Sequence, residues 1–243
     1  MVKLRDFALT YRLYILPTVY VTVIYGYLVA NNGISWSTAL LLGLVSLSAH
    51  ILGFGINDLM DLKYDKLNPR HLRRSLFVRG ELSTNWHIVI TLIQIPILLI
   101  WALILELPRE TFLIASASFV ALMVYNVFAK KSGVLVLFID LFFPLSMALL
   151  LLTGFSMSAP ISELSQSAIL LVICSFMGFF LGNSILAGFR DINSDLDEGA
   201  SNFHGALGSK SANLRIHLSQ SSRVISHVVY LLNVPLLFAM AYL

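Results

Sequence analysis

The chain has 243 residues, of which 58% are hydrophobic and only 12% are charged, and its formal net charge is +3. A soluble domain carries about 25% charged residues, so this composition excludes an ordinary soluble protein and predicts one embedded in a lipid bilayer. The single cysteine, Cys174, excludes an intrachain disulfide and a cysteine-based metal cluster.

Apolar stretches long enough to cross a bilayer recur along the whole chain. A membrane-spanning helix needs about 20 mostly apolar residues. Such stretches lie at residues 12–30, 36–56, 88–106, 110–128, 133–153, 167–189 and 221–243. The first has no small-residue cleavage pattern, so we expect it to be retained as an anchor. The sequence predicts an all-α integral membrane helical bundle with about seven transmembrane helices, built as a single domain over residues 1–243.

The basic residues occupy alternate connections between these stretches. All lysines and arginines except Arg109 lie at or before the start of the first span, or after the second, fourth or sixth. Loops rich in lysine and arginine are retained in the cytoplasm. We therefore expect a multi-pass protein with a cytoplasmic N-terminus and, after an odd number of spans, a C-terminus on the opposite side.

Carboxylates gather directly after the second predicted span. Asp58, Asp61 and Asp65 share one face if the helix continues past the membrane, and Asn57 adds an amide oxygen. Hard oxygen ligands of this kind suit Mg²⁺ bound to a diphosphate. The alternative is a solvated acidic helix end. Like charges at this spacing repel one another, however, and a bound cation offsets that repulsion.

A second acidic stretch, residues 190–198, follows the sixth predicted span on the same cytoplasmic side. Asp191 and Asp195 are four residues apart and can reach the same cavity. The spacing of the two acidic stretches along the chain predicts two related helical units that face one central cavity. The alternative is a helix end that frays into a polar, glycine-containing loop.

Basic residues follow the first acidic stretch, from Lys66 to Arg79. Guanidinium groups match phosphate oxygens in charge and shape. We therefore expect Arg70 and Arg74 to bind a diphosphate, together with the amide of Asn57. The retention of basic loops in the cytoplasm accounts for part of this positive charge by itself.

Two polar residues stand out within the predicted spans. Asp140 lies inside the fifth span, where an acidic group is costly and is by default a functional candidate. It is expected to orient or deprotonate an acceptor. A hydrogen bond to a neighbouring helix is the alternative role. His50 lies two helical turns before Asn57 and is expected to line the cavity, with simple packing as the alternative.

The two acidic stretches carry a resemblance to a known family. Residues 57–65 read N-D-x-x-D-x-x-x-D, and residues 190–199 read R-D-x-x-x-D-x-x-x-G. With the basic stretch from Asn68 to Ser83, they resemble the UbiA superfamily of intramembrane prenyltransferases over about residues 12–230. Relatives usually have more helices than the number predicted here. His71, Ser75 and Gly188 depart from the usual family pattern.

The resemblance implies Mg²⁺-dependent transfer of a (poly)prenyl group from an allylic prenyl diphosphate to a lipophilic or aromatic acceptor in the membrane. It implies catalytic roles for Asp58, Asp61, Asp191 and Tyr125, the last through the face of its ring. An interfacial aromatic anchor is the alternative role of Tyr125. The implied metal ligands are Asp58, Asp61, Asp65, Asp191 and Asp195. The implied diphosphate-binding cations include Lys130, Lys131 and Arg190.

Other functions remain compatible with the same residues. A prenyltransferase with a non-aromatic acceptor would act on a polyprenyl phosphate sugar, a haem, a carotenoid or a glycerol phosphate. A non-catalytic membrane protein that binds isoprenoids is the alternative from another class. A transporter fits less well, because charged residues avoid the middle of the spans apart from Asp140. No nucleic-acid partner is indicated, and the oligomeric state is left open.

Overall fold

The computed structural model describes residues 4–31, 33–66, 69–129, 133–189, 192, 203–212 and 215–241. Within these residues, six helices are long and apolar enough to cross a membrane: Leu13–Ala30, Trp36–Asp65, Thr84–Ile104, Arg109–Phe128, Val136–Ser156 and Gln166–Ala187. They confirm the first six predicted spans and the prediction of a helical membrane protein. The seventh predicted span, 221–243, falls mainly within helix α13 (Gln220–Ala241).

The chain forms two compact units. The first consists of Met1–Ser116 and Leu150–Ile161, and the second consists of Ala117–Leu149 and Ser162–Leu243. Helices α7 (Arg109–Phe128) and α9 (Phe142–Ser156) contribute residues to both units. Each unit is described by itself below.

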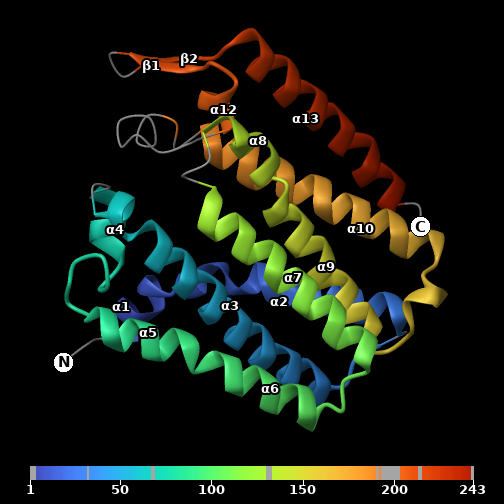
Figure 1. Ribbon diagram of the computed structural model, residues 1–243. Helices are drawn as coiled ribbons and strands as arrows, with labels where there is room; N and C mark the ends of the chain where they lie inside the picture. The colour runs from blue at the N-terminus through green and yellow to red at the C-terminus, as the bar shows by residue number, and fades with distance from the viewer. Residues whose placement is uncertain are drawn as a thin grey trace. The chain divides into compact units, whose positions relative to one another are not determined.

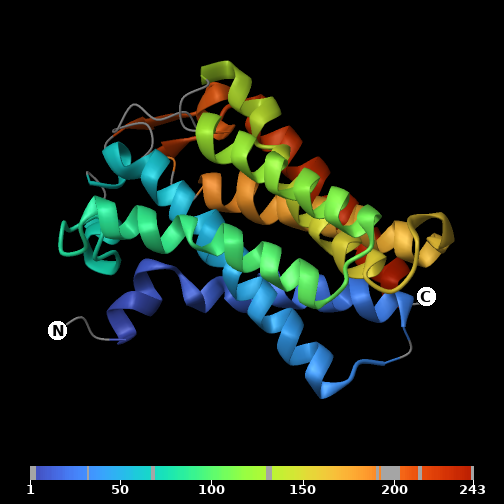
Figure 2. The same cartoon turned by 60° about the horizontal axis from the view of Figure 1, so that its bottom comes forward.

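The first unit is built around the long helix α3 (Trp36–Asp65), which Figure 1 shows in blue. Helix α3 packs against α2, α5 and α6, and the turned view shows α2 and α3 side by side (Figure 2). The other elements of this unit have the bounds α1 (Leu4–Thr10), η1 (Leu13–Ile15), α2 (Leu16–Ala30), α4 (Pro69–Arg74), α5 (Thr84–Leu92) and α6 (Gln94–Ile104).

Helix α3 extends well beyond the predicted span that ends at residue 56. Ser35 starts it as an N-cap, because its Oγ accepts a hydrogen bond from the amide of Thr38 at 3.1 Å. The helix then continues without a break to Asp65. The first acidic stretch therefore belongs to the same rigid helix as the apolar span before it.

Proline residues explain where two other spans are interrupted. Pro96 cannot donate to the carbonyl of Leu92, and α5 ends at Leu92. In the same way Pro144 leaves the carbonyl of Asp140 without its helical donor, and the span breaks between α8 (Val136–Ile139) and α9. The Ser184 hydroxyl donates to this carbonyl at 3.3 Å. It supplies a hydrogen bond that lipid could not.

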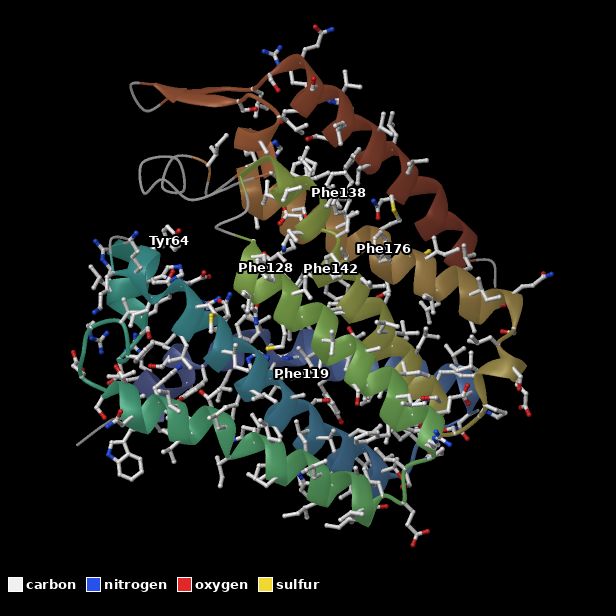
Figure 3. All side chains as sticks on the ribbon, in the orientation of Figure 1. Tyr64, Phe119, Phe128, Phe138, Phe142 and Phe176 are labelled. Carbon is white, nitrogen blue, oxygen red and sulfur yellow. The ribbon has the colours of Figure 1, made fainter. Side chains whose placement is uncertain are left out.

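The second unit contains α10 (Gln166–Phe179), the π-helical segment η4 (Phe180–Ala187) and α13, which pack against one another. Its buried core consists of Phe180, Ile185, Phe203 and Val229. Phenylalanines also lie along its helices, among them Phe128 on α7, Phe142 on α9 and Phe176 on α10 (Figure 3). The smaller elements are η2 (Gly133–Leu135), α12 (Phe203–Ala206), β1 (Lys210–Ala212) and β2 (Arg215–His217), and η3 (Ile161–Glu163) lies where the chain passes between the units.

The two strands form an antiparallel pair in which Lys210 lies opposite His217. These two are the only strands among the residues that the structure describes. The pair follows α12 and leads into α13, so it does not alter the helical architecture.

Glycines bring the backbones of α2 and α9 into direct contact within the first unit. A Cβ atom at Gly26 would lie 1.9 Å from the carbonyl oxygen of Leu151, and one at Gly154 would lie 2.0 Å from the carbonyl oxygen of Val23. Helices in lipid associate through such close packing of small residues. Neither position accepts a side chain unless the two helices move apart.

We expect Gly26→Ala to lower the free energy of unfolding by about 1–3 kcal/mol, because the added methyl group overlaps backbone atoms. Thermal unfolding of the detergent-solubilised protein measures the effect. Gly178→Ala is the matched control, since a Cβ at that helical position meets no atom within 4 Å. Equal melting temperatures for the two variants would contradict the close contact.

Candidate functional site

The first acidic stretch is buried at the end of α3. Asp58 is 2% exposed, Asp61 is 7% exposed and Asp65 is 1% exposed. A solvated acidic helix end would leave these carboxylates in water, so their burial is contrary to that alternative. Buried carboxylates need ionic or hydrogen-bonding partners.

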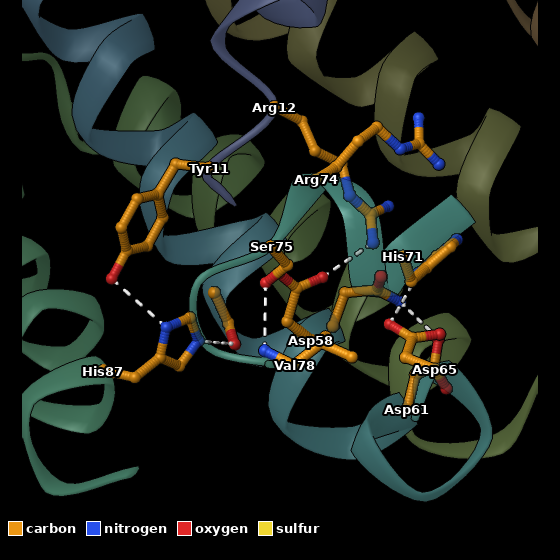
Figure 4. Close-up of polar contacts among 12 residues, drawn as sticks. Tyr11, Arg12, Asp58, Asp61, Asp65, His71, Arg74, Ser75, Val78 and His87 are labelled. Carbon is orange, nitrogen blue, oxygen red and sulfur yellow. Dashed lines mark hydrogen bonds and ion pairs between the residues drawn. The ribbon is translucent and has the colours of Figure 1, made fainter. Parts of the chain in front are cut away.

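Arg12 provides the partner of Asp58. Its Nη2 donates to Asp58 Oδ1 at 2.7 Å (Figure 4). The guanidinium carbon also lies 5.2 Å from the centre of the Phe54 ring, one turn earlier on α3. Sequence analysis assigned Arg12 only to the cytoplasmic charge bias, because 46 residues separate it from Asp58.

The backbone of Arg12 is left-handed, with φ 50° and ψ 38°. Residues other than glycine rarely adopt this conformation, and it costs roughly 1–2 kcal/mol. His50 stabilises it, because its Nε2 lies 2.9 Å from the carbonyl oxygen of Tyr11 and 3.2 Å from that of Arg12. Carbonyl oxygens only accept, so this Nε2 carries the hydrogen. His50 was predicted to line the cavity, and the structure places its ring against the backbone behind Arg12.

The side chain of Tyr11 fixes the same segment from the other side. His87 Nε2 lies 3.1 Å from the carbonyl oxygen of Gly55 and must donate to it. His87 Nδ1 is therefore the acceptor for the Tyr11 hydroxyl, 3.2 Å away. The His87 ring is also stacked between Tyr11 and Phe77, with centroid distances of 5.4 and 4.0 Å. Both Tyr11 and His87 are fully buried.

A third contact ties this segment to the loop after α4. Thr10 Oγ1 accepts a hydrogen bond from the amide of Leu76 at 3.0 Å, and it donates to the carbonyl of Asp6 at 2.8 Å. Residues 10–12 are thus attached to α3, to α5 and to this loop. The position of the Arg12 guanidinium over Asp58 is set by all three.

The other residues of the acidic stretch also have partners. His71 Nδ1 lies 2.9 Å from Asp65 Oδ2, and Asn57 Nδ2 donates to Asp61 Oδ2 at 3.1 Å. Arg74, a predicted diphosphate ligand, donates from Nη1 to the hydroxyl of Tyr14 at 3.0 Å. Arg70, the other one, lies in α4 with Arg74.

A small cavity of about 10 Å³ lies beside these side chains. It is lined by Leu9, Thr10, Arg12, Asp58, Asp65, His71, Arg74 and Ser75. This volume holds about one water molecule. A diphosphate would require the lining side chains to move apart.

The electrostatics of the site follow from burial and from the carboxylates. Burial lowers the pKa of the Arg12 guanidinium, but the nearby carboxylates, Asp58 foremost, outweigh this effect and raise it above its ordinary value. Burial, helped by the charge of Asp58, raises the pKa of the Tyr11 phenol. Arg12 is therefore a permanent cation, and Tyr11 keeps its hydroxyl hydrogen.

The donor set of this stretch fits a hard divalent cation. Three carboxylates and an amide oxygen are ligands that Mg²⁺ prefers. Among the described residues, however, no group of three acidic, histidine or cysteine side chains is arranged to hold a metal ion. The other predicted ligands belong to the second acidic stretch. Asp191, Asp195 and Arg190 lie outside the described residues, as do Lys130 and Lys131.

Tyr125 belongs to a polar and aromatic group in the second unit. Its hydroxyl oxygen accepts a hydrogen bond from Asn183 Nδ2 at 3.0 Å, and its ring centre lies 5.4 Å from that of Phe143. Asn183 lies in the π-helical segment η4, and such segments are frequent at functional sites. Sequence analysis did not select Asn183, because a single asparagine carries no motif.

Asp140 also lies in the second unit and is 6% exposed. Its main-chain carbonyl accepts the hydrogen bond from Ser184. Ser184 lies a few residues before the second acidic stretch. The helix break at Asp140 places a buried carboxylate beside non-helical backbone. Such backbone occurs at membrane depth only where protein or a water-filled cavity surrounds it.

His204 is a buried residue that sequence analysis did not single out. Its Nε2 lies 2.9 Å from the carbonyl oxygen of Ile185 and donates to it, and its Nδ1 contacts the hydroxyl of Ser222. This ring therefore joins α12 to η4 and to the start of α13. Burial lowers the pKa of His204, so the folded protein holds the ring in its neutral form.

We expect the protein to lose stability as the pH falls below about 6.5, where unfolded histidine becomes protonated. His204 binds a proton in the unfolded chain but stays neutral when buried in the folded protein. The free energy of unfolding therefore falls by up to about 1.4 kcal/mol per pH unit. Melting temperatures at pH 7.5 and 5.5 measure it. The difference should shrink in His204→Gln and stay unchanged in His227→Gln, since His227 is exposed. An unchanged difference in both would contradict this role.

Comparisons with known proteins show the family and the fold of the chain. The sequence model of the UbiA prenyltransferase family matches residues 19–243. None of the curated proteins compared with the chain matches it. Among solved structures, the apo structure of a UbiA homolog from Aeropyrum pernix K1 is 19% identical, with a TM-score of 0.66. The match covers 98% of this chain and 79% of that one. At this identity the likeness shows a common fold.

Proposed function

The chain belongs to the UbiA prenyltransferase family, and from this premise we propose that it is a Mg²⁺-dependent enzyme. It transfers a prenyl group from an allylic prenyl diphosphate to a lipophilic or aromatic acceptor in the membrane. Family membership implies prenyltransferase activity in a membrane. The observation that carries the finer proposal is the complete N-D-x-x-D-x-x-x-D motif on one helix, whose three aspartates are buried.

The acidic residues hold the metal in this proposal. The proposed ligands are Asp58, Asp61, Asp65, Asp191 and Asp195. When bound, Mg²⁺ supplies a Lewis acid and a template for the diphosphate. The hydrogen bond from Asn57 to Asp61 orients one of these carboxylates.

The basic residues stabilise the leaving group. An allylic diphosphate departs readily once its developing negative charge is neutralised, and fixed cations do so without reorganisation. We assign this role to Arg70, Arg74, Lys130, Lys131 and Arg190. The prenyl cation left behind faces the ring of Tyr125, whose π electrons stabilise positive charge. Asn183 fixes the position of that ring through the phenol oxygen.

The acceptor is captured next to this cation. A buried carboxylate that neighbours irregular backbone suits the orientation or deprotonation of an acceptor, and we assign this role to Asp140. An aromatic or other lipophilic acceptor reaches this depth from the bilayer. The acceptor proton passes to the Asp140 carboxylate as the new bond to the prenyl carbon forms, and the diphosphate is the leaving group.

We expect Asp61→Ala to lower turnover at least about 100-fold, because one ligand of the proposed metal is removed. Asp61 is preferred to Asp58 for this test, since Asp58 forms the ion pair with Arg12 and removing Asp61 leaves that pair in place. Asp191→Ala should have a similar effect. Turnover is measured as transfer of radiolabelled prenyl groups to a lipid extract, with and without a chelator.

Glu163→Ala is the matched control, because it removes an exposed carboxylate on a short 3₁₀ turn. It should retain full turnover. Near-normal turnover of both aspartate variants would contradict the metal assignment. Binding of prenyl diphosphate by the wild type without any product would instead indicate a non-catalytic isoprenoid-binding protein.

We further propose that the N-terminus and both acidic stretches face the cytoplasm. Cysteines placed at Ser83 and Ser158 in a Cys174→Ala background should react with an impermeant thiol reagent from opposite sides of the membrane. Both positions are exposed in the structure. Labelling of both from one side would contradict this orientation.

A further inference from the structure

Arg12 has more hydrogen-bond donors than the described part of the chain uses. A guanidinium carries five N–H groups, and among the described residues only Nη2 donates, to Asp58 Oδ1 at 2.7 Å. The side chain is 23% exposed and borders the small cavity together with Asp65, His71 and Arg74. The remaining N–H groups need an acceptor that the described part of the chain does not supply.

Asp58 is likewise engaged through only one of its two oxygens. Oδ1 accepts from Arg12, and Oδ2 makes no hydrogen bond to the residues that the structure describes. A carboxylate with one bound oxygen still offers the other to a metal ion. The ion pair is therefore compatible with a metal at Asp58, and Arg12 does not have to leave for the metal to bind.

The guanidinium is held where it is by its backbone. The left-handed conformation at Arg12 turns the chain at the end of α1, and His50 Nε2 binds the carbonyls on both sides of the turn. Among the described residues, the hydrogen bonds of His50 go to these two carbonyls and not to the guanidinium. It acts on the cation only through the backbone.

We propose that Arg12 binds the diphosphate of the prenyl donor through its remaining N–H groups while it keeps its bond to Asp58, and that His50 is the residue that positions it. The inference rests on the proposed function and adds a ligand to the same site. A guanidinium suits this task because it can bind a carboxylate and a phosphate oxygen at once. The pair then holds diphosphate and metal next to each other.

Binding of inorganic pyrophosphate to the detergent-solubilised protein, measured by isothermal titration calorimetry with Mg²⁺ present, tests Arg12 without turnover. Arg12→Gln should weaken binding about 10- to 100-fold, the size of a lost charged hydrogen bond. Arg12→Lys keeps the positive charge that pairs with buried Asp58, but it removes the planar guanidinium that can bind two oxygens at once. It should weaken binding by at least about threefold.

Arg5→Gln is the matched control. It removes one cation from the same N-terminal segment, and Arg5 is exposed on α1. Its affinity for pyrophosphate should equal that of the wild type. A loss as large as that of Arg12→Gln would mean that general positive charge, and not Arg12 itself, binds the anion, and would overturn the proposal.

A double-mutant cycle tests the positioning role of His50. His50→Leu removes the donor to both carbonyls and leaves every charge of the site in place, so it should weaken pyrophosphate binding about 3- to 10-fold. In the Arg12→Gln background it should have no further effect. Additive losses would show that His50 acts on folding or on another ligand, and would overturn this part.

The outcomes separate this inference from the proposed function. A wild-type protein that binds neither pyrophosphate nor a prenyl diphosphate refutes both. Wild-type binding with unchanged affinity in Arg12→Lys and His50→Leu refutes only the role of Arg12. If Arg12→Gln does not fold, because it leaves Asp58 buried without its partner, these two variants still decide the question.

Discussion

The buried ion pair between Arg12 and Asp58 is the interaction on which the rest of the first unit depends. A carboxylate taken out of water destabilises the fold unless a cation accompanies it. Here that cation lies 46 residues earlier in the chain and has a strained backbone conformation. Three hydrogen bonds hold the segment that carries Arg12 in place. They involve His50, His87 and Thr10.

Lipid imposes a second constraint, which acts on the backbone. Every carbonyl at membrane depth needs a donor from the protein, and the prolines of the spans leave some carbonyls without one. The carbonyl of Asp140 accepts a hydrogen bond from Ser184 of η4, the segment that leads to the second acidic stretch. A helix break that would be a defect in lipid thereby links two elements that both carry candidate site residues.

The sequence predicted the spans and the first acidic stretch well, since both depend on local spacing along one helix. The spacing of Asp58, Asp61 and Asp65 is that of one helical face, and α3 does continue to Asp65. Arg12 and His87 were beyond reach, because their roles come from contacts across 46 and 76 residues that no local pattern reports. The contacts of His204 were missed for the same reason, since its partners Ile185 and Ser222 lie 19 and 18 residues away.

The direct backbone contact of Gly26 with α9 influences the position of Arg12, although Gly26 does not touch Arg12 or Asp58. Helix α2 begins shortly after Arg12, and at 1.5 Å per residue Gly26 lies about 20 Å further along. Because α2 cannot shift without losing this contact, the contact fixes the reach of the segment that carries the arginine. A substitution at Gly26 or Gly154 is therefore expected to weaken substrate binding as well as stability, although neither residue belongs to the proposed site.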